Sequence, residues 1–413
     1  MARCSWIVMM TVALGLLRGE AAAQVTGRIV GPGATRLEIA VSPLADGGGG
    51  KEVGEHFAEV LSRNLTLSGY FRVLDPKAYL EGPTPVDGSQ INFANWTVIG
   101  AKALVKGSVS QSGGSLALEA RLYDVVQHTQ IGGERYTGSP DLLERMARRF
   151  ADQIMEYLTG EAGPFDSRIA FASRRGGRAK EILVMSVDGY DVTTVTNNRT
   201  INLAPSWSPN AGSILFTSFM DGNASLYRAD IGGRSVQKLS SSRGLNLGGR
   251  WSPDGRSIAI SLERSGNSDI FILDDTGRVQ RQLTNGAEID VSPTWSPDGR
   301  QIAFVSSRTG MPQIYVMGAD GSSPRRVTFQ GGYNTSPCWS PKGDLIGYVS
   351  RERGFNVFTL NLKTNQVRQI TSGGNNEDPS FSPDGRYLVF SSTRVGKPAL
   401  FLADSTGEHQ VQL

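Results

Sequence analysis

A five-residue turn motif, repeated at a nearly constant interval, constrains the fold of this chain more than any other feature. WSPDG occurs at 251–255 and 295–299, and related turns begin at Trp207, Trp339 and Phe381. Successive aromatic residues of these turns stand 44, 44, 44 and 42 positions apart. A fixed period of this size indicates a repeat architecture, in which every unit has the same internal layout.

Each repeat contains four short strand signals. The turn leads into an apolar segment such as 301–306 (QIAFVS), and a second segment such as 313–318 (QIYVMG) follows a loop. A third segment comes after another turn, and the fourth ends at the next aromatic residue. Four strands per period of about 44 residues are typical of a β-propeller blade. Residues 168–196 fit the same layout without the turn, so the sequence predicts six blades within 161–413.

The composition of the turn explains why it recurs. Proline presets φ at the corner, aspartate bonds to nearby amides, and glycine takes the position with positive φ that closes the hairpin. The preceding tryptophan or phenylalanine is predicted to fill the space where neighbouring blades meet. The motif is therefore interpreted as structural rather than catalytic.

The closure of the ring stays open at this point. In propellers one terminus usually completes a blade that the other began, which leaves no strand edge exposed. The chain ends at 409–413 (HQVQL), the third strand signal of its repeat, and a fourth strand ending in an aromatic residue is missing. Either the last strand is truncated, or residues 161–168 (EAGPFDSR) close the ring from the N-terminal side.

The region 24–160 alternates strand and helix signals and predicts a small α/β domain. Gly69 suits the end of one helix, and Ser139 and Pro140 suit the N-cap and first turn of another. The expected elements are strands at 36–44 and 70–75, helices at 51–69, 93–101 and 139–160, and a hairpin at 102–126. The fold class expected for the whole chain is α+β multidomain, an N-terminal α/β domain followed by a six-bladed β-propeller.

Residues 1–23 have the pattern of a secretory signal peptide. Arg3 precedes an apolar segment at 6–17, and Ala21 and Ala23 occupy the small-residue positions before cleavage after Ala23. That segment is too short to cross about 30 Å of hydrocarbon as a helix, so no membrane insertion is expected. Cleavage after Ala23 also removes Cys4 and leaves Cys338 as the single cysteine. Cys338 is predicted to be a buried, inert thiol. An exported chain without a disulfide points to the periplasm.

Catalytic signatures are not found in the sequence. No nucleophile elbow, zinc-binding helix motif, P-loop or dinucleotide fingerprint occurs, and the three histidines lie outside the repeat core. We therefore expect no catalytic residues and no metal ligands, and the protein is predicted not to be an enzyme. The alternative is an exported propeller hydrolase or lyase that uses carboxylates in the tunnel. The net charge of +3 gives no reason to expect nucleic acid as a partner.

One repeated position is not required by the turn. The residue five places before each blade aromatic is always Asn or Asp: Asn202, Asn246, Asp290, Asn334 and Asn376. These side chains are predicted to ring one mouth of the central tunnel. They either satisfy local hydrogen bonds at strand starts, or form a rim that binds a partner peptide. No cofactor is expected, apart from a weak possibility of a cation held by such oxygens in the tunnel.

The mature N-terminus is glycine-rich. Residues 24–35 (QVTGRIVGPGAT) form either a flexible terminus or a recognition arm that adds a strand to a partner sheet. The candidate contact residues of this arm are Gln24, Val25, Arg28, Ile29 and Val30.

These features, in this order, resemble the TolB family of the periplasmic Tol–Pal system. The resemblance rests on the signal peptide, on GAKALVKGSV (100–109) and ARLYDV (120–125), on YLTGEAGPFDSRIAF (157–171), and on the WSPDG propeller. It implies a non-enzymatic, monomeric adaptor whose propeller mouth binds the peptidoglycan-associated lipoprotein Pal and whose N-terminal arm contacts TolA. It also implies that colicins use the propeller site for import in some bacteria, and that the system supports outer-membrane integrity and cell division.

Overall fold

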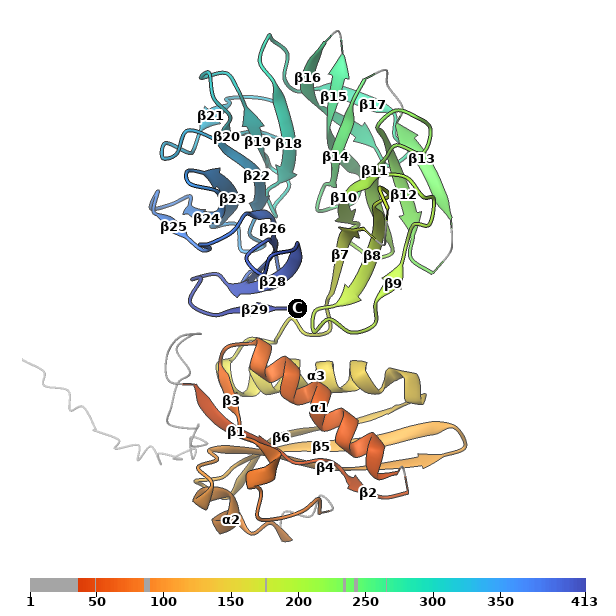
Figure 1. Cartoon of the computed structure of the whole chain (residues 1–413), viewed down its shortest axis with the longest axis vertical. Helices are drawn as coiled ribbons and strands as arrows, with labels where there is room; N and C mark the ends of the chain where they lie inside the picture. The colour runs from red at the N-terminus through yellow and green to blue at the C-terminus, as the bar shows by residue number, and fades with distance from the viewer. Residues whose placement is uncertain are drawn as a thin grey trace, which may run out of the picture.

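Two bodies of different architecture follow one another along the chain, as Figure 1 shows for this computed structural model. The structure describes residues 36–413 except 49, 85–89, 175–176, 233–234, 241–243 and 265. The signal-peptide and N-terminal-arm predictions therefore lie outside the described residues. Within the described part of the chain, no helix is long and apolar enough to cross a membrane.

The N-terminal body is built on one mixed sheet of order β3-β1-β4-β5-β6, with β2 paired to β4. β1 runs parallel to β3 and β4, whereas β4, β5 and β6 form an antiparallel meander. The strands are β1 Leu37–Val41, β2 Ala45–Asp46, β3 Phe71–Val73, β4 Ala103–Ser112, β5 Ser115–Asp124 and β6 Thr129–Gly138. The sequence did not reveal β6, because its glycines and charges (TQIGGERYTG) hide the alternation of a half-buried strand.

Two long helices lie between this sheet and the propeller (Figure 1). They are amphipathic, and residues such as Phe57 and Phe150 are fully buried against the sheet. The helical segments are η1 Pro76–Ala78, α1 Lys51–Leu67, α2 Phe93–Val98, η3 Pro140–Leu142 and α3 Leu143–Thr159. The predicted start of the last helix was wrong, since Ser139 and Pro140 open the 3-10 turn η3 and Ser139 makes no capping hydrogen bond. Its hydroxyl bonds to Asp141 instead.

Six antiparallel sheets make the propeller, and each is called a blade here, numbered in chain order. Blade 1 is β7 Arg168–Ser173, β8 Glu181–Ser186 and β9 Thr193–Thr194. Blade 2 is β10 Asn202–Trp207, β11 Ser213–Ser218, β12 Ser225–Asp230 and β13 Val236–Ser240. Blade 3 is β14 Asn246–Trp251, β15 Ser257–Arg264, β16 Asn267–Asp274 and β17 Val279–Gln282.

Blade 4 is β18 Asp290–Trp295, β19 Gln301–Ser306, β20 Gln313–Gly318 and β21 Arg325–Arg326. Blade 5 is β22 Asn334–Trp339, β23 Leu345–Arg351, β24 Phe355–Asn361 and β25 Val367–Gln369. Blade 6 is β26 Asn376–Phe381, β27 Tyr387–Ser392, β28 Ala399–Asp404 and β29 Gln410–Gln412. The predicted six blades are confirmed.

The WSPDG turn has the predicted structural role. In blade 4 the Ser296 hydroxyl and the Arg300 amide both donate to Asp298 Oδ1, at 2.6 and 3.0 Å. Gly299 has φ 70° and its amide donates to the Ser296 carbonyl. Trp295 packs in an apolar cluster with residues of blades 3 and 4, so the aromatic residue fills the space between blades.

Ring closure by residues 161–168 is wrong. Glu161–Ser167 contain no strand, and β7 begins only at Arg168 and pairs with β8. Blade 1 therefore has three strands and the other five have four, among the described residues. Accordingly β7 is more exposed than its counterparts β11, β15 and β19.

A bulge that the sequence did not reveal interrupts each inner strand, the first strand of a four-stranded blade. Its third residue has positive φ, and the pairing with the second strand shifts register there. The five residues are Ala204, Gly248, Ser292, Ser336 and Asp378. Bulges of this kind bend a strand and re-aim the residues that follow it.

The two bodies share one apolar core. The core of the N-terminal domain includes Val187 from blade 1 and Tyr387 and Leu402 from blade 6. The Tyr387 hydroxyl donates to the Ser68 carbonyl at 2.9 Å, directly after α1. The N-terminal domain therefore packs on the first and the last blade together.

A buried ion pair stands at the same interface. Asp188, which is fully buried after β8, accepts hydrogen bonds from Arg148 Nε of α3 at 2.7 Å and Asn64 Nδ2 of α1 at 2.9 Å. The Arg63 Nε donates to the Asp188 carbonyl at 2.5 Å. Both helices are thus fastened to one aspartate of blade 1.

The junction between α3 and the propeller contains a carboxyl group with a shifted pKa. Burial raises the pKa of Asp152 to about 7, and the nearby Asp166 and Asp384 add to the shift, although Asp152 accepts hydrogen bonds from the amides of Phe165 and Asp166. The folded pKa lies above the unfolded value of about 3.9. The stability that protonated Asp152 contributes is therefore complete below pH 4 and is lost as pH rises toward 7.

We expect Asp152→Asn to lose less stability than the wild type between about pH 4 and pH 7, because the variant has no carboxyl group to ionise at this buried site. Urea denaturation at several pH values measures this difference. Parallel stability curves for the two proteins over that range would contradict the assignment.

Candidate functional site

The candidate site is the face of the propeller where the inner strands begin, which is called the mouth here. In every four-stranded blade the inner strand starts at the Asn or Asp predicted from the repeat: Asn202, Asn246, Asp290, Asn334 and Asn376. The loops between second and third strands lie at the same face, because consecutive strands are antiparallel. The structure therefore brings the five predicted residues to one face of the ring.

All five Asn/Asp side chains are buried, with at most 2% of their surface exposed. Their amides donate to the preceding blade: Asn202 Nδ2 to the Lys180 carbonyl at 2.8 Å, and Asn246 Nδ2 to the Ala224 carbonyl at 2.8 Å. Asn334 Nδ2 donates to Gln313 Oε1 of the preceding blade, also at 2.8 Å. The asparagines thus bind their inner strands to the preceding blade, whereas Asp290 pairs with Arg308 of its own blade.

Two members of the ring are paired with arginines from their own blades. Arg308 Nη2 donates to Asp290 Oδ2 at 2.9 Å, and the guanidinium lies 4.9 Å from the centre of the Tyr315 ring. In blade 6, Arg394 Nη2 donates to Asn376 Oδ1 at 2.9 Å, with its guanidinium 4.7 Å from the centre of the Phe401 ring. Hydrogen bonding and stacking together hold these arginines beneath the mouth.

This geometry matches local hydrogen bonding, the first of the two roles predicted for the ring. A partner would not touch these side chains without displacing them from buried hydrogen bonds. Their action on a partner would therefore pass through the strand starts and loops that they hold, and direct binding by them stays a prediction.

The residues just before the ring present an exposed apolar surface that the sequence analysis missed. The apolar ring consists of Ile201, Leu245, Ile289 and Tyr333. The first three are 40%, 44% and 54% exposed, and Tyr333 is half-buried against Phe355. Each carbonyl accepts a hydrogen bond from a backbone amide at the end of the second strand of the same blade, so all four occupy equivalent positions. An apolar or aromatic residue directly before four of the five Asn and Asp positions was the available signal, since Asn375 precedes Asn376.

Blade 4 extends this surface outward. Met311, in the loop before β20, is 55% exposed, and Phe329, after β21, is 75% exposed. The Arg326 guanidinium lies 5.3 Å from the centre of the Phe329 ring. The mouth therefore carries apolar and aromatic side chains of the kind that form interaction hot spots.

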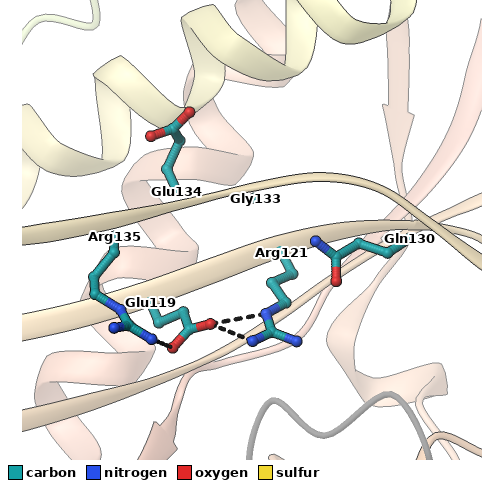
Figure 2. A pocket seen from close by; sticks show the side chains of 6 residues that line it. All are labelled: Glu119, Arg121, Gln130, Gly133, Glu134 and Arg135. Carbon is teal, nitrogen blue, oxygen red and sulfur yellow. Dashed lines mark hydrogen bonds and ion pairs between the residues drawn. The ribbon is translucent and has the colours of Figure 1, made fainter.

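A separate cavity of about 290 Å³ lies on the sheet of the N-terminal domain, between residues of β5 and β6. Figure 2 shows Glu119 between Arg121 and Arg135, with Gln130, Gly133 and Glu134 completing the lining. Arg121 Nε donates to Glu119 Oε1 at 2.8 Å and Arg135 Nη2 donates to Oε2 at 2.7 Å. The guanidiniums of Arg135 and Arg121 lower the pKa of Glu119, so its carboxylate is already paired and is unsuited to act as a base.

The side chains of the described residues offer little catalytic chemistry. Cys338 is half-buried rather than fully buried as predicted, and desolvation raises the pKa of its thiol to about 12, which disfavours the reactive thiolate. Among the residues that the structure describes, no group of three or more His, Cys, Asp or Glu could hold a metal ion.

Comparisons with known proteins agree with this architecture. The model of the TolB amino-terminal domain matches residues 26–131, and the model of the TolB beta propeller domain matches residues 155–413. The crystal structure of TolB from Acinetobacter baumannii is similar with a TM-score of 0.82 and 27% identity, over 92% of this chain and 93% of that one.

Curated relatives match over shorter stretches. The Tol-Pal system protein TolB of Desulfosudis oleivorans is 39% identical over 206 residues, which cover 48% of this chain and 47% of that protein. The protein of the same name from Geobacter metallireducens is 42% identical over 188 residues, covering 45% and 43%. The chain thus spans about half the length of the curated relatives it matches. Because the propeller model alone matches more than half of the chain, the chain belongs to the TolB family.

Proposed function

We propose that this protein is a non-enzymatic, monomeric adaptor of the periplasmic Tol–Pal system, which binds the peptidoglycan-associated lipoprotein Pal through the propeller mouth. Membership of the TolB family, whose relatives are named as Tol–Pal components, supports this role. In this role the protein supports outer-membrane integrity and cell division, and the same mouth receives colicins in bacteria that import them.

The observation that carries the proposal is the apolar ring at the mouth. Four apolar side chains repeat around one face, and soluble proteins rarely leave such surfaces without a partner. The buried Asn/Asp ring and the stacked arginines fix the strand starts beneath them. A surface prepared in this way loses little conformational entropy when a partner binds.

The second proposed contact is between the N-terminal arm and the periplasmic domain of TolA. The residues proposed for it are Gln24, Val25, Arg28, Ile29 and Val30. An arm of this kind would bind by adding a strand to the edge of a partner sheet.

Calorimetric titration with the periplasmic domain of Pal from the same organism tests the first contact. We expect a dissociation constant in the micromolar range or tighter, about −8 kcal/mol or better. The double variant Leu245→Ser/Ile289→Ser should weaken binding by about 10- to 100-fold, because it removes two apolar contacts from the centre of the surface.

Val279→Ser is the matched control, since Val279 is 43% exposed on the outer strand β17 of the same blade as Leu245. Its affinity for Pal should equal that of the wild type. Two results would refute a binding site at the apolar ring. One is that the wild type does not bind Pal, and the other is that the double variant binds Pal with the affinity of the wild type.

A further inference from the structure

Arg250 occupies an unusual place in the ring of inner strands. It is the fifth residue of β14 and pairs in register with Ala259 of the second strand. The same register position in the other four-stranded blades is held by short side chains: Ser206, Thr294, Cys338 and Ser380. Four uncharged, short residues and one arginine therefore stand at the same level of the propeller.

The arginine side chain extends toward the centre of the ring. Its Nη1 donates to the Pro205 carbonyl of blade 2 at 3.1 Å. The Asp378 carboxylate of blade 6 also acts on it electrostatically. Because these residues belong to blades on different sides of the ring, a side chain that senses both of them must lie near the common axis.

The guanidinium of Arg250 has five N–H donors, and among the described residues one of them has a hydrogen-bond acceptor, the Pro205 carbonyl. Within the described part of the chain, no carboxylate oxygen lies within 4.0 Å of it, since Arg250 forms none of the ion pairs found there. Arg250 is half-buried, and the desolvation of its guanidinium lowers its pKa. Arg148, by contrast, is buried and pairs with two carboxylates, those of Asp188 and Asp191.

We propose that Arg250 is an anion-binding residue at the centre of the propeller, and that it receives the carboxylate of a peptide segment inserted along the axis. A planar guanidinium binds a carboxylate through two parallel hydrogen bonds, and this pairing is strongest where water is largely excluded. The residues at the same level of the other four-stranded blades have short side chains, which take up little of the space beside Arg250. The carboxylate comes from an acidic side chain or from a chain end, which have the same chemistry.

This site differs from the mouth. Arg250 lies next to the WSPDG turn, at the opposite end of β14 from Asn246 and the apolar ring. A segment that reaches it has passed the length of the inner strand. The inference therefore does not depend on which partner binds at the mouth.

The melting temperature in citrate, compared with that in sodium chloride at equal ionic strength, measures anion binding at Arg250. Citrate supplies carboxylates without a peptide. We expect about 20 mM citrate to raise the melting temperature of the wild type by about 1–3 °C more than that of Arg250→Met. Arg250→Lys, which keeps the charge but loses the planar fork, should show an intermediate response.

The matched control is Arg256→Met, because Arg256 is an exposed arginine of the same blade. Its response to citrate should equal that of the wild type. In chloride, Arg250→Met should melt at the same temperature as the wild type or higher, because an unpaired, enclosed charge is removed. An equal citrate response in all four proteins, or a lower melting temperature of Arg250→Met in chloride, would overturn the proposal.

Discussion

Asp188→Ala should lower the free energy of unfolding by about 3–5 kcal/mol, the largest loss we expect from one substitution in this protein. The fully buried carboxylate is the common partner of Arg148 Nε and Asn64 Nδ2. Its removal leaves the Arg148 guanidinium, itself 4% exposed, with the 51% exposed Asp191 as its remaining ion-pair partner between the two domains. Denaturation followed by tryptophan fluorescence and by circular dichroism measures the loss.

Asp191→Asn is the matched control for this experiment. Asp191 also accepts from Arg148, at 2.7 Å from Nη1, but it is 51% exposed, so solvent screens the pair. Asparagine tolerates the positive φ of 54° at this position. A loss below about 1 kcal/mol is expected. Similar losses for the two substitutions would show that burial of Asp188 does not determine the strength of the interface.

Asn334→Ala should lower the free energy of unfolding by about 2–4 kcal/mol while the folded protein keeps its affinity for Pal. Asn334 Nδ2 donates to Gln313 Oε1 and to the Gln330 carbonyl, each at 2.8 Å. The truncation leaves the buried Gln313 Oε1 and the part-buried Gln330 carbonyl without this donor. Urea denaturation gives the stability, and titration with Pal below the transition gives the affinity.

Asn197→Ala is the control, because Asn197 is exposed near the end of blade 1 and should tolerate truncation within about 0.5 kcal/mol. The pair of measurements separates the two roles predicted for the Asn/Asp ring. Unchanged stability with a loss of Pal binding would show that Asn334 contacts the partner, against the buried geometry described above.

The repeated features of the sequence predicted the fold well. The period of about 44 residues specified the blades, and the chemistry of Pro, Asp and Gly specified the turn, because both depend on local geometry alone. The strand β6 escaped detection because Gly132 and Gly133 interrupt its pattern, and its place in the sheet depends on pairing with β5.

The candidate site was predicted only in part. Spacing placed Asn246 and its four counterparts at strand starts, but it did not reveal that their side chains point into the wall between blades. Leu245 resembles a core residue in the sequence, and its exposure follows from the end of the strand at the mouth. The orientation of the Arg250 side chain could not be predicted from the sequence. It depends on the bulge at Gly248, for which the sequence has no recognised pattern.

The shared core between the domains has a kinetic consequence. Propellers open most readily where the first and last blades meet, because no continuous backbone runs across that seam within the ring. Here Val187 on one side of the seam and Tyr387 and Leu402 on the other pack into one core with α1 and α3. The N-terminal domain therefore acts as a clasp across the seam. Opening of the ring requires this domain to detach first, so the lifetime of the closed propeller is set by an interface outside it.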